Sequence, residues 1–255
     1  MTQENKKSVV YTCLTGNYDN LIQLSYVDND WDYICYTDNP SLLKQNKAGI
    51  WNIRPLVFNK LNNSKNSRWH KIHALDILPR YNESIYIDAN VNILTSYFFN
   101  MLKSNTKDIL VPMHHSRDCI YAECEVVIST DKDSEKVCRS QIDYIRSTGF
   151  PSHYGLSENN IIYRKHGNQK TGKIMEEWWQ FIEKYSTRDQ LSFSYVLWNN
   201  GIQIKNISFP NIRHDKINFS IETHKLKWKG KLFHIESLPS GRKRLFIIGK
   251  KIFSF

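Results

Sequence analysis

Short runs of apolar and β-branched residues, each followed by small polar residues, recur along the first third of the chain. These runs cover residues 9–13, 33–36, 50–53 and 85–88. Apolar runs bounded by turn-forming residues are typical of β-strands. The pattern therefore predicts strands whose carboxyl ends carry polar side chains.

Between and after these runs, apolar residues return at helical spacing. Trp69, Ile72 and Leu75 predict a helix that starts after an N-cap at Ser67 and stops at Pro79. Further strands are predicted at residues 108–113 and 160–163, and helices at residues 131–149, 175–185 and 187–198. Strands that alternate with helices indicate an α/β fold around a mostly parallel sheet.

In such a sheet, ligands bind beyond the carboxyl ends of the strands. Residues 16–19, 38–39 and 88–90 would gather at that edge. The ten glycines never occur as G-x-G, so the sequence lacks both a dinucleotide fingerprint and a phosphate loop. Metal and basic side chains would have to balance the charge of a phosphorylated ligand.

Asp88 and Asn90 directly follow the strand predicted at residues 85–88. Residues i and i+2 of an extended segment point to the same side, so both oxygens can converge on one hard cation. The alternative is an Asx turn at the end of the strand. Arg68 and Lys71 lie three positions apart on the preceding helix; they suit two contacts to one diphosphate, or form a solvated pair.

The segment that follows the strand at 108–113 is rich in hydrogen-bonding groups: His114, His115, Arg117 and Asp118. Such groups suit sugar hydroxyls and phosphate. A zinc site built from the adjacent histidines is disfavoured, because neighbouring side chains on an extended chain point apart.

The start of the helix predicted at residues 187–198 has two interpretations. Ser186 with Asp189, or Thr187 with Gln190, has the spacing of a capping box. Alternatively, Asp189 faces a sugar ring. The sequence leaves both open.

Length and composition fit one large globular domain: 255 residues, of which 40% are hydrophobic. No apolar signal region and no membrane-spanning run are visible, so we expect a cytoplasmic protein. Five cysteines without a C-x-x-C pair argue against a disulfide framework and a structural zinc site.

The net charge of +10 is concentrated at one end of the chain. Residues 225–255 hold nine Lys or Arg and one acid, a net charge of +8. This asymmetry argues against a nucleic-acid-binding face and for a basic tail on an enzyme-like body. Because aromatic and aliphatic residues alternate with the basic ones, the tail has the composition of an anchor to an anionic membrane surface. The alternative is that residues 245–248 form one more strand of the core.

Seven ordered motifs between residues 9 and 198 resemble one glycosyltransferase-like family. They are YTCLTGNYD, DYICYTDN, RWHK before LPRYNESIYIDAN, HHSRDCIYAE, GFPSHYGLSENNIIYRKH, EEWW and STRDQLSFSYVLW. The family includes plant mucilage-related Golgi proteins and bacterial proteins of surface-polysaccharide loci. More distantly, the chain is similar to glycosyltransferase family 8.

The resemblance implies a GT-A fold over residues 1–224, followed by the tail at 225–255. It also implies a divalent cation, Mn²⁺ or Mg²⁺, and a nucleotide-sugar co-substrate, expected to be a uridine diphosphate sugar. Asn90 stands where the family usually has a second acid. Together with the His114 segment, the resemblance assigns three groups of residues. The expected cation ligands are Asp88, Asn90 and His214, with His224 as an alternative. The residues expected to bind the nucleotide sugar are Thr15, Tyr18, Asp38, Arg68, Lys71, His114 and His115, and those expected to act in catalysis are Asp189, Gln190, Arg117 and Asp118.

The sequence thus predicts a glycosyltransferase that acts on a glycan or lipid-linked glycan acceptor in bacterial surface-polysaccharide synthesis. We expect it at the inner face of the cytoplasmic membrane, with retention weakly favoured over inversion. Two rivals stay open. One is a metal-dependent hydrolase that uses Asp88 with His114 and His115, and the other is a non-catalytic module that binds membrane or nucleic acid through the tail.

Overall fold

The computed structural model describes residues 8–223, together with the backbone of residues 233–237, 243–247 and 250–254. His224, one of the two expected histidine ligands, lies outside the described residues.

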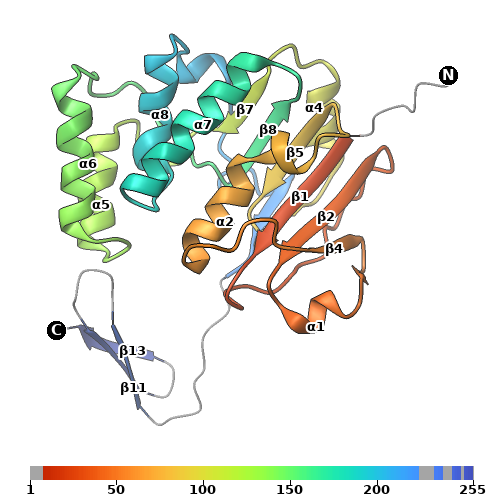
Figure 1. Cartoon of the computed structure of the whole chain (residues 1–255), viewed down its shortest axis with the longest axis horizontal. Helices are drawn as coiled ribbons and strands as arrows, with labels where there is room; N and C mark the ends of the chain where they lie inside the picture. Colours follow the sequence, from red (N-terminus) through yellow and green to blue (C-terminus); the bar gives the residue numbers. More distant parts are fainter. Residues whose placement is uncertain (1–7, 224–232, 238–242, 248–249, 255) are drawn as a thin grey trace.

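Eight strands form one large mixed sheet in the order β3-β4-β2-β1-β5-β8-β7-β9 (Figure 1). Their bounds are β1 (Ser8–Leu14), β2 (Trp31–Thr37), β3 (Lys47–Ala48), β4 (Trp51–Pro55), β5 (Glu83–Ile87), β7 (Ile109–Pro112), β8 (Ile161–Lys165) and β9 (Ser208–Phe209). The prediction of a mostly parallel sheet needs a correction. The β1, β2, β4 and β5 part is parallel, but β8 runs antiparallel to both β5 and β7.

Helices cover this sheet and confirm the predicted α/β class. Their bounds are α1 (Pro40–Leu43), α2 (Asn63–Ile72), α3 (Ala74–Ile77), α4 (Tyr97–Lys103), α5 (Ile120–Ser129), α6 (Glu135–Ser147), α7 (Gln169–Lys184), α8 (Gln190–Asn199) and the short 3-10 helix Ile204–Asn206. Helix α2 starts earlier than predicted, because Asn62 rather than Ser67 caps it by accepting a hydrogen bond from the Lys65 N–H. Helices α4 and α5 were not predicted.

The alternation of residues along β1 builds two cores, one on each face of the sheet. Val9 and Tyr11 point into a core shared with α2 and α5 to α8, whereas Val10 and Leu14 point into a core shared with α4. Figure 1 shows the larger group of helices on one side of the sheet. Since α2 and α8 both lie on that side, side chains from the two helices can meet at the sheet's edge.

Two small sheets complete the described chain. Strands β6 (Val91–Ile93) and β10 (Phe219–Ile221) pair antiparallel just after Asp88. In the tail, β11 (Phe233–Ser237), β12 (Lys243–Ile247) and β13 (Lys250–Ser254) form a separate three-stranded antiparallel sheet. The alternative that the tail adds a strand to the large sheet is therefore wrong for β12.

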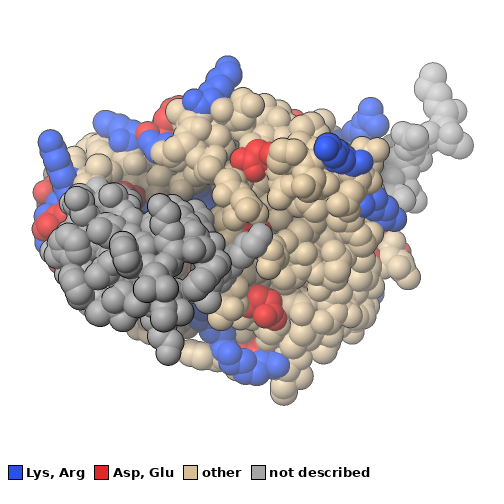
Figure 2. Space-filling view, turned by 90° about the horizontal axis from the view of Figure 1, so that it is seen from below, with Lys and Arg blue, Asp and Glu red and all other residues tan. Residues whose placement is uncertain are grey.

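The charged side chains of the described residues are spread out on the face that Figure 2 shows. On the face shown in Figure 2, the Lys and Arg side chains of the described residues are scattered mostly around the periphery, with broad uncharged areas between them. Among the described residues, no helix combines the length and the apolar character needed to cross a bilayer. The charges that matter most for a ligand are those inside the cavity described next.

Candidate active site

A cavity of about 810 Å³ opens at the carboxyl ends of β1, β5 and β7. Strand β8 lies between β5 and β7 and runs the opposite way, so its amino end reaches the same edge. The start of α2, the last turn of α2 and the start of α8 supply further wall. Residues that are distant in the sequence thus share one site.

Four charged side chains form the centre of this cavity. Lys71 Nζ lies 2.7 Å from Asp189 Oδ2 and 3.5 Å from Asp88 Oδ1, and Arg68 Nε lies 3.2 Å from Asp189 Oδ2. The side chains of Lys71 and Asp189 are only 2% and 6% exposed, whereas that of Asp88 is 33% exposed. Asp88 is therefore the carboxylate of this group that a ligand or cation meets most directly.

Asp189 does not cap helix α8, although it occupies the N-cap position. Its backbone is helical and its side chain makes no capping hydrogen bond. The capping-box interpretation is therefore wrong for Asp189; Ser186 and Thr187 instead donate hydrogen bonds to the Asp133 carboxylate. Burial alone would raise the pKa of Asp189, yet Lys71 and Arg68 hold that pKa below its usual value.

A network of buried hydrogen bonds fixes the carboxyl end of α2. Arg164, which is fully buried, donates hydrogen bonds to the Ile72 carbonyl (2.9 Å) and to the Tyr11 hydroxyl (2.7 Å). Tyr11 in turn donates to the Lys71 carbonyl (2.9 Å). These bonds occupy carbonyls that have no partner within the last turn of a helix. The backbone that carries Lys71 is thereby held to the central strands β1 and β8.

Asp88 and Asn90 lie on the cavity wall, as the sequence predicted. The Asn90 amide nitrogen donates to the Glu222 carbonyl at 3.0 Å, so its oxygen is the atom that suits a cation. Two hard oxygen ligands fit Mg²⁺ or Mn²⁺ in the mode in which substrate phosphates and water complete the shell. Among the described residues, no group of three His, Cys, Asp or Glu side chains forms a metal cage. The residues thus fit a cation shared with a ligand.

The loop after β1 forms the wall next to Arg68. Thr15 and Tyr18 line the cavity there; the Thr15 hydroxyl donates to the Asn63 carbonyl at 2.9 Å. Gly16 has a φ of +63°, and a Cβ at this position would lie 2.2 Å from the Asn63 side chain. Asp38 is not part of the cavity wall; its carboxylate accepts from the Gly16 N–H at 3.0 Å and so holds the loop from behind.

His114 and His115 stack at the opposite end, with ring centroids 4.4 Å apart. Burial, and secondarily His115 and Arg117, lower the pKa of His114 to about 3. The backbone N–H groups of Ser116 and Arg117 donate to His114 Nδ1, which requires an unprotonated nitrogen. Burial also lowers the pKa of His115. Both rings are neutral at pH 7, as suits hydrogen bonding to a sugar.

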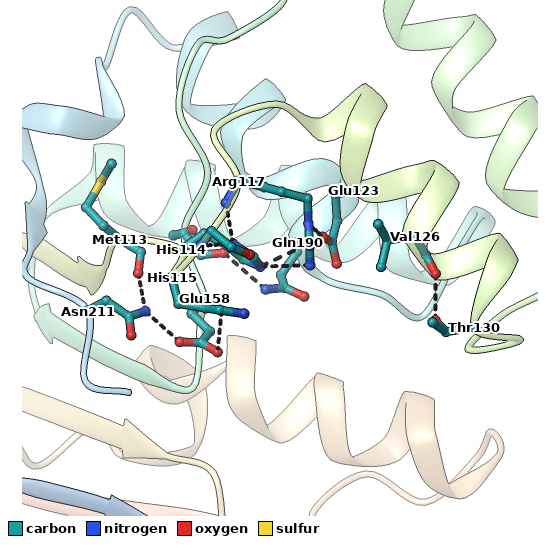
Figure 3. A network of polar contacts seen from close by, with 12 residues as sticks. Met113, His114, His115, Arg117, Glu123, Val126, Thr130, Glu158, Gln190 and Asn211 are labelled. Carbon is teal, nitrogen blue, oxygen red and sulfur yellow. Dashed lines mark hydrogen bonds and ion pairs between the residues drawn. The ribbon is translucent and has the colours of Figure 1, made fainter. Parts of the chain in front are cut away.

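Two buried glutamates form ion pairs and hydrogen bonds at this end of the cavity (Figure 3). In Figure 3, Glu123 pairs with Arg117, and Glu158 accepts from Asn211 at 2.7 Å. Glu158 also pairs with Arg213. Glu158 stands at the amino end of β8. Sequence analysis missed both glutamates. Glu123 lies on α5, a helix that was not predicted. Glu158 precedes β8, whose amino end reaches the cavity because β8 runs antiparallel to its neighbours.

The structure brings together most of the predicted site residues but not all. Asp118 and His214 are not part of the cavity wall; Asp118 pairs with His153 on the surface at 2.8 Å. Asn160 was missed, although it lines the wall beside Asp88: it is 5% exposed, and both polar atoms of its side chain are buried without a hydrogen-bond partner. A sequence signal existed in the polar run from Glu158 to Asn160 before an apolar strand.

Comparison with known families supports a carbohydrate-active role for this cavity. Residues 2–224 match the model of the family described as TOD1/MUCI70, glycosyltransferase-like domain. The match includes every described residue of the cavity wall and agrees with the resemblance found in the motifs. No match was found among curated proteins.

Several solved glycosyltransferases show a low overall similarity. The galactosyltransferase LgtC, solved with donor and acceptor sugar analogs, has a TM-score of 0.46 and 12% identity, covering 79% of this chain and 72% of that chain. The bifunctional glycosyltransferase WbbM has a TM-score of 0.45 and 9% identity, and the match covers 81% of this chain and 39% of that chain. Mouse xyloside xylosyltransferase 1 has a TM-score of 0.42 and 10% identity, and the match covers 80% of this chain and 84% of that chain. The chain thus spans about two fifths of WbbM, and these scores carry no argument about function.

Proposed function

The chain belongs to the TOD1/MUCI70 glycosyltransferase-like family, and from this premise we propose that it transfers a sugar from a uridine diphosphate sugar to a glycan or lipid-linked glycan acceptor. The observation that carries the proposal is the charged group formed by Arg68, Lys71, Asp88 and Asp189 in the cavity. It lies where ligands bind in α/β folds.

The charge of this group explains why a cation belongs to the proposal. Two basic and two acidic side chains carry no net charge, so they do not balance the negative charge of a diphosphate. Asp88 and Asn90 would hold Mn²⁺ or Mg²⁺ together with the diphosphate. When bound, the cation would supply Lewis-acid stabilisation of the leaving group.

Arg68 and Lys71 have a second role in this scheme. They face the position of the diphosphate and can donate charge-assisted hydrogen bonds to its oxygens. Lys71 is 1% exposed and held at its backbone by Tyr11, so its ammonium group is oriented before the ligand arrives. Such preorganisation avoids reorientation during the reaction.

Asp189 suits charge stabilisation better than proton transfer. Lys71 and Arg68 keep it ionised, and an ionised carboxylate beside the anomeric carbon stabilises positive charge that develops on the sugar ring. Gln190, 7% exposed on the same wall, would hydrogen-bond the sugar. This arrangement favours the retaining route.

The cellular setting in the proposal rests on resemblance and tail composition. We place the enzyme in bacterial surface-polysaccharide synthesis, in the cytoplasm, with residues 225–255 against the anionic inner surface of the membrane. Acceptors built on membrane lipids would then lie within reach of the cavity.

A thermal-shift titration tests the central proposal. Uridine diphosphate at about a hundred times its dissociation constant should raise the melting temperature by about 5 to 10 °C with Mn²⁺, and clearly less without it. Asp88→Ala should lose the Mn²⁺-dependent part, whereas Asn90→Asp should keep it. Asp143→Ala, an exposed acid on α6, is the control.

Transfer assays then separate this function from its rivals. Product that forms only when donor and acceptor are both present supports transfer. Hydrolysis of a substrate without any donor would support the hydrolase that uses Asp88 and the histidines. Full activity in Asp88→Ala would contradict the site assignment.

A further inference from the structure

The end of the cavity next to the histidines holds an excess of basic side chains. Lys132 follows α5 and Arg188 precedes Asp189 at the start of α8, and both line the wall. Four basic and three acidic side chains line this end in total: Arg117, Lys132, Arg188, Arg213, Glu123, Asp131 and Glu158.

The glutamates of this end are already neutralised by other residues. Glu123 pairs with Arg117, and Glu158 pairs with Arg213. Within residues 8–223, no carboxylate forms an ion pair with Lys132 or Arg188. Arg188 Nε is buried without a hydrogen-bond partner. Buried donors without partners are uncommon in folded proteins and call for a ligand or water.

Most of the charged side chains that act on Lys132 are basic. Its pKa is lowered by burial and then by the nearby charge of Arg188, despite the opposing effect of Glu123. An anion bound beside Lys132 and Arg188 would offset the repulsion that lowers the pKa of Lys132.

This basic pair is distinct from the one proposed for the donor. The charges that act on Arg68 are Asp189, Asp88 and the tyrosines at positions 86 and 18. Those that act on Lys132 are Arg188, Glu123, Arg117 and Arg213, on the histidine side. Both groups line the same cavity, and Asp189, which pairs with Arg68 and Lys71, directly follows Arg188 in the sequence.

We propose that Lys132 and Arg188 form a subsite for an anionic group on the acceptor, so that the enzyme extends an acidic or phosphorylated glycan. This inference rests on the proposed glycosyl transfer and specifies its acceptor.

Direct binding of small anions tests the subsite. Glucuronic acid, inorganic phosphate and uncharged glucose are titrated by calorimetry into wild-type protein saturated with uridine diphosphate and Mn²⁺. An anionic probe should bind, and glucose should bind more weakly. Preference for glucuronic acid indicates a carboxylate acceptor, and preference for phosphate indicates a phosphorylated one.

Variants then assign the binding to the two residues. Arg188→Gln and Lys132→Gln should each weaken the anionic probe by about tenfold, because each removes one charge-assisted contact. Arg188→Lys keeps the charge and should weaken it less. Lys136→Gln, on the exposed side of α6, should have no effect.

Separate measurement of uridine diphosphate affinity keeps the two proposals distinguishable. Unchanged nucleotide affinity in both Gln variants supports an acceptor subsite. A parallel loss of nucleotide affinity would overturn it, because these residues would then hold the donor. Equal binding of glucose and the anions, or no anion binding by the wild type, would also overturn the subsite while leaving nucleotide binding intact.

Discussion

Replacing Asp189 by Asn should destabilise the protein far more than loss of a helix cap would. The substitution keeps the shape of the side chain but leaves the 2% exposed Lys71 with only Asp88, 3.5 Å away, as a carboxylate partner. Removing one partner of a buried ion pair costs about 3 to 5 kcal/mol of unfolding free energy, because a charge stays buried without compensation. A lost N-cap would cost about 0.5 to 2 kcal/mol.

A double-mutant cycle measures this coupling. Urea unfolding is followed for the wild type, Asp189→Asn, Lys71→Met and the double variant. The double variant should lose less stability than the sum of the single ones, by about 0.5 to 3 kcal/mol. The control is Asp143→Asn, which removes an exposed pair with Arg146 and should change stability by less than about 0.5 kcal/mol.

The pH dependence gives a second check with a defined sign. The folded-state pKa of Asp189 is lowered from 3.8. Its contribution is therefore fully present above pH 3.8 and is lost as the pH falls below it. The stability difference between wild type and Asp189→Asn should shrink in that acid range. Additive single effects, or a loss below about 1 kcal/mol in Asp189→Asn, would refute the assigned role of this ion pair.

Three further predictions concern the support of the site, the buried histidines and the tail. Tyr11→Phe leaves buried Arg164 without one acceptor and should cost about 1 to 3 kcal/mol in urea unfolding. A cost below that of Tyr36→Phe, which removes the bond to the Ile77 carbonyl, would contradict the network. Burial lowers the pKa of His70 to about 4, so its neutral form stabilises the fold above pH 6.5 and this contribution declines as the pH falls. Other buried histidines also lose stability in this range, so between pH 7 and 5 the wild type should lose about 2 kcal/mol more than His70→Gln. Deletion of residues 240–255 should release the protein from anionic vesicles, each basic residue contributing about 1 kcal/mol, and leave nucleotide binding intact; a full chain that never sediments with such vesicles at low salt would contradict the anchor.

Local pattern alone was sufficient for the elements that position Arg68, Lys71 and Asp88. The apolar run that ends at Asp88 is β5, and the helical spacing around Trp69 belongs to α2, which carries Arg68 and Lys71. These features depend on alternation and periodicity within a few residues, which a single sequence displays directly. The family resemblance added the position of Asp189.

Element boundaries and strand direction were harder to predict. Asn62 and Ser67 are both acceptable N-caps, and only packing selects the first. Direction also decides which end of β8 faces the cavity, and pairing with β5 is a long-range choice. The prediction of a mostly parallel sheet therefore missed Glu158 and Asn160, which enter the site from an amino end.

The electrostatics of the site were decided by tertiary structure. Lys71 and Asp189 are 118 positions apart, and nothing in the local sequence of either distinguishes a buried ion pair from a solvated lysine and a helix cap. The fold removes both side chains from water. Burial alone would raise the pKa of Asp189, and pairing with Lys71 and Arg68 overcomes that effect and keeps the carboxylate ionised. The types of residue needed for the chemistry were thus visible along the chain, whereas their partners and burial followed from the packing of α2 and α8 against the sheet.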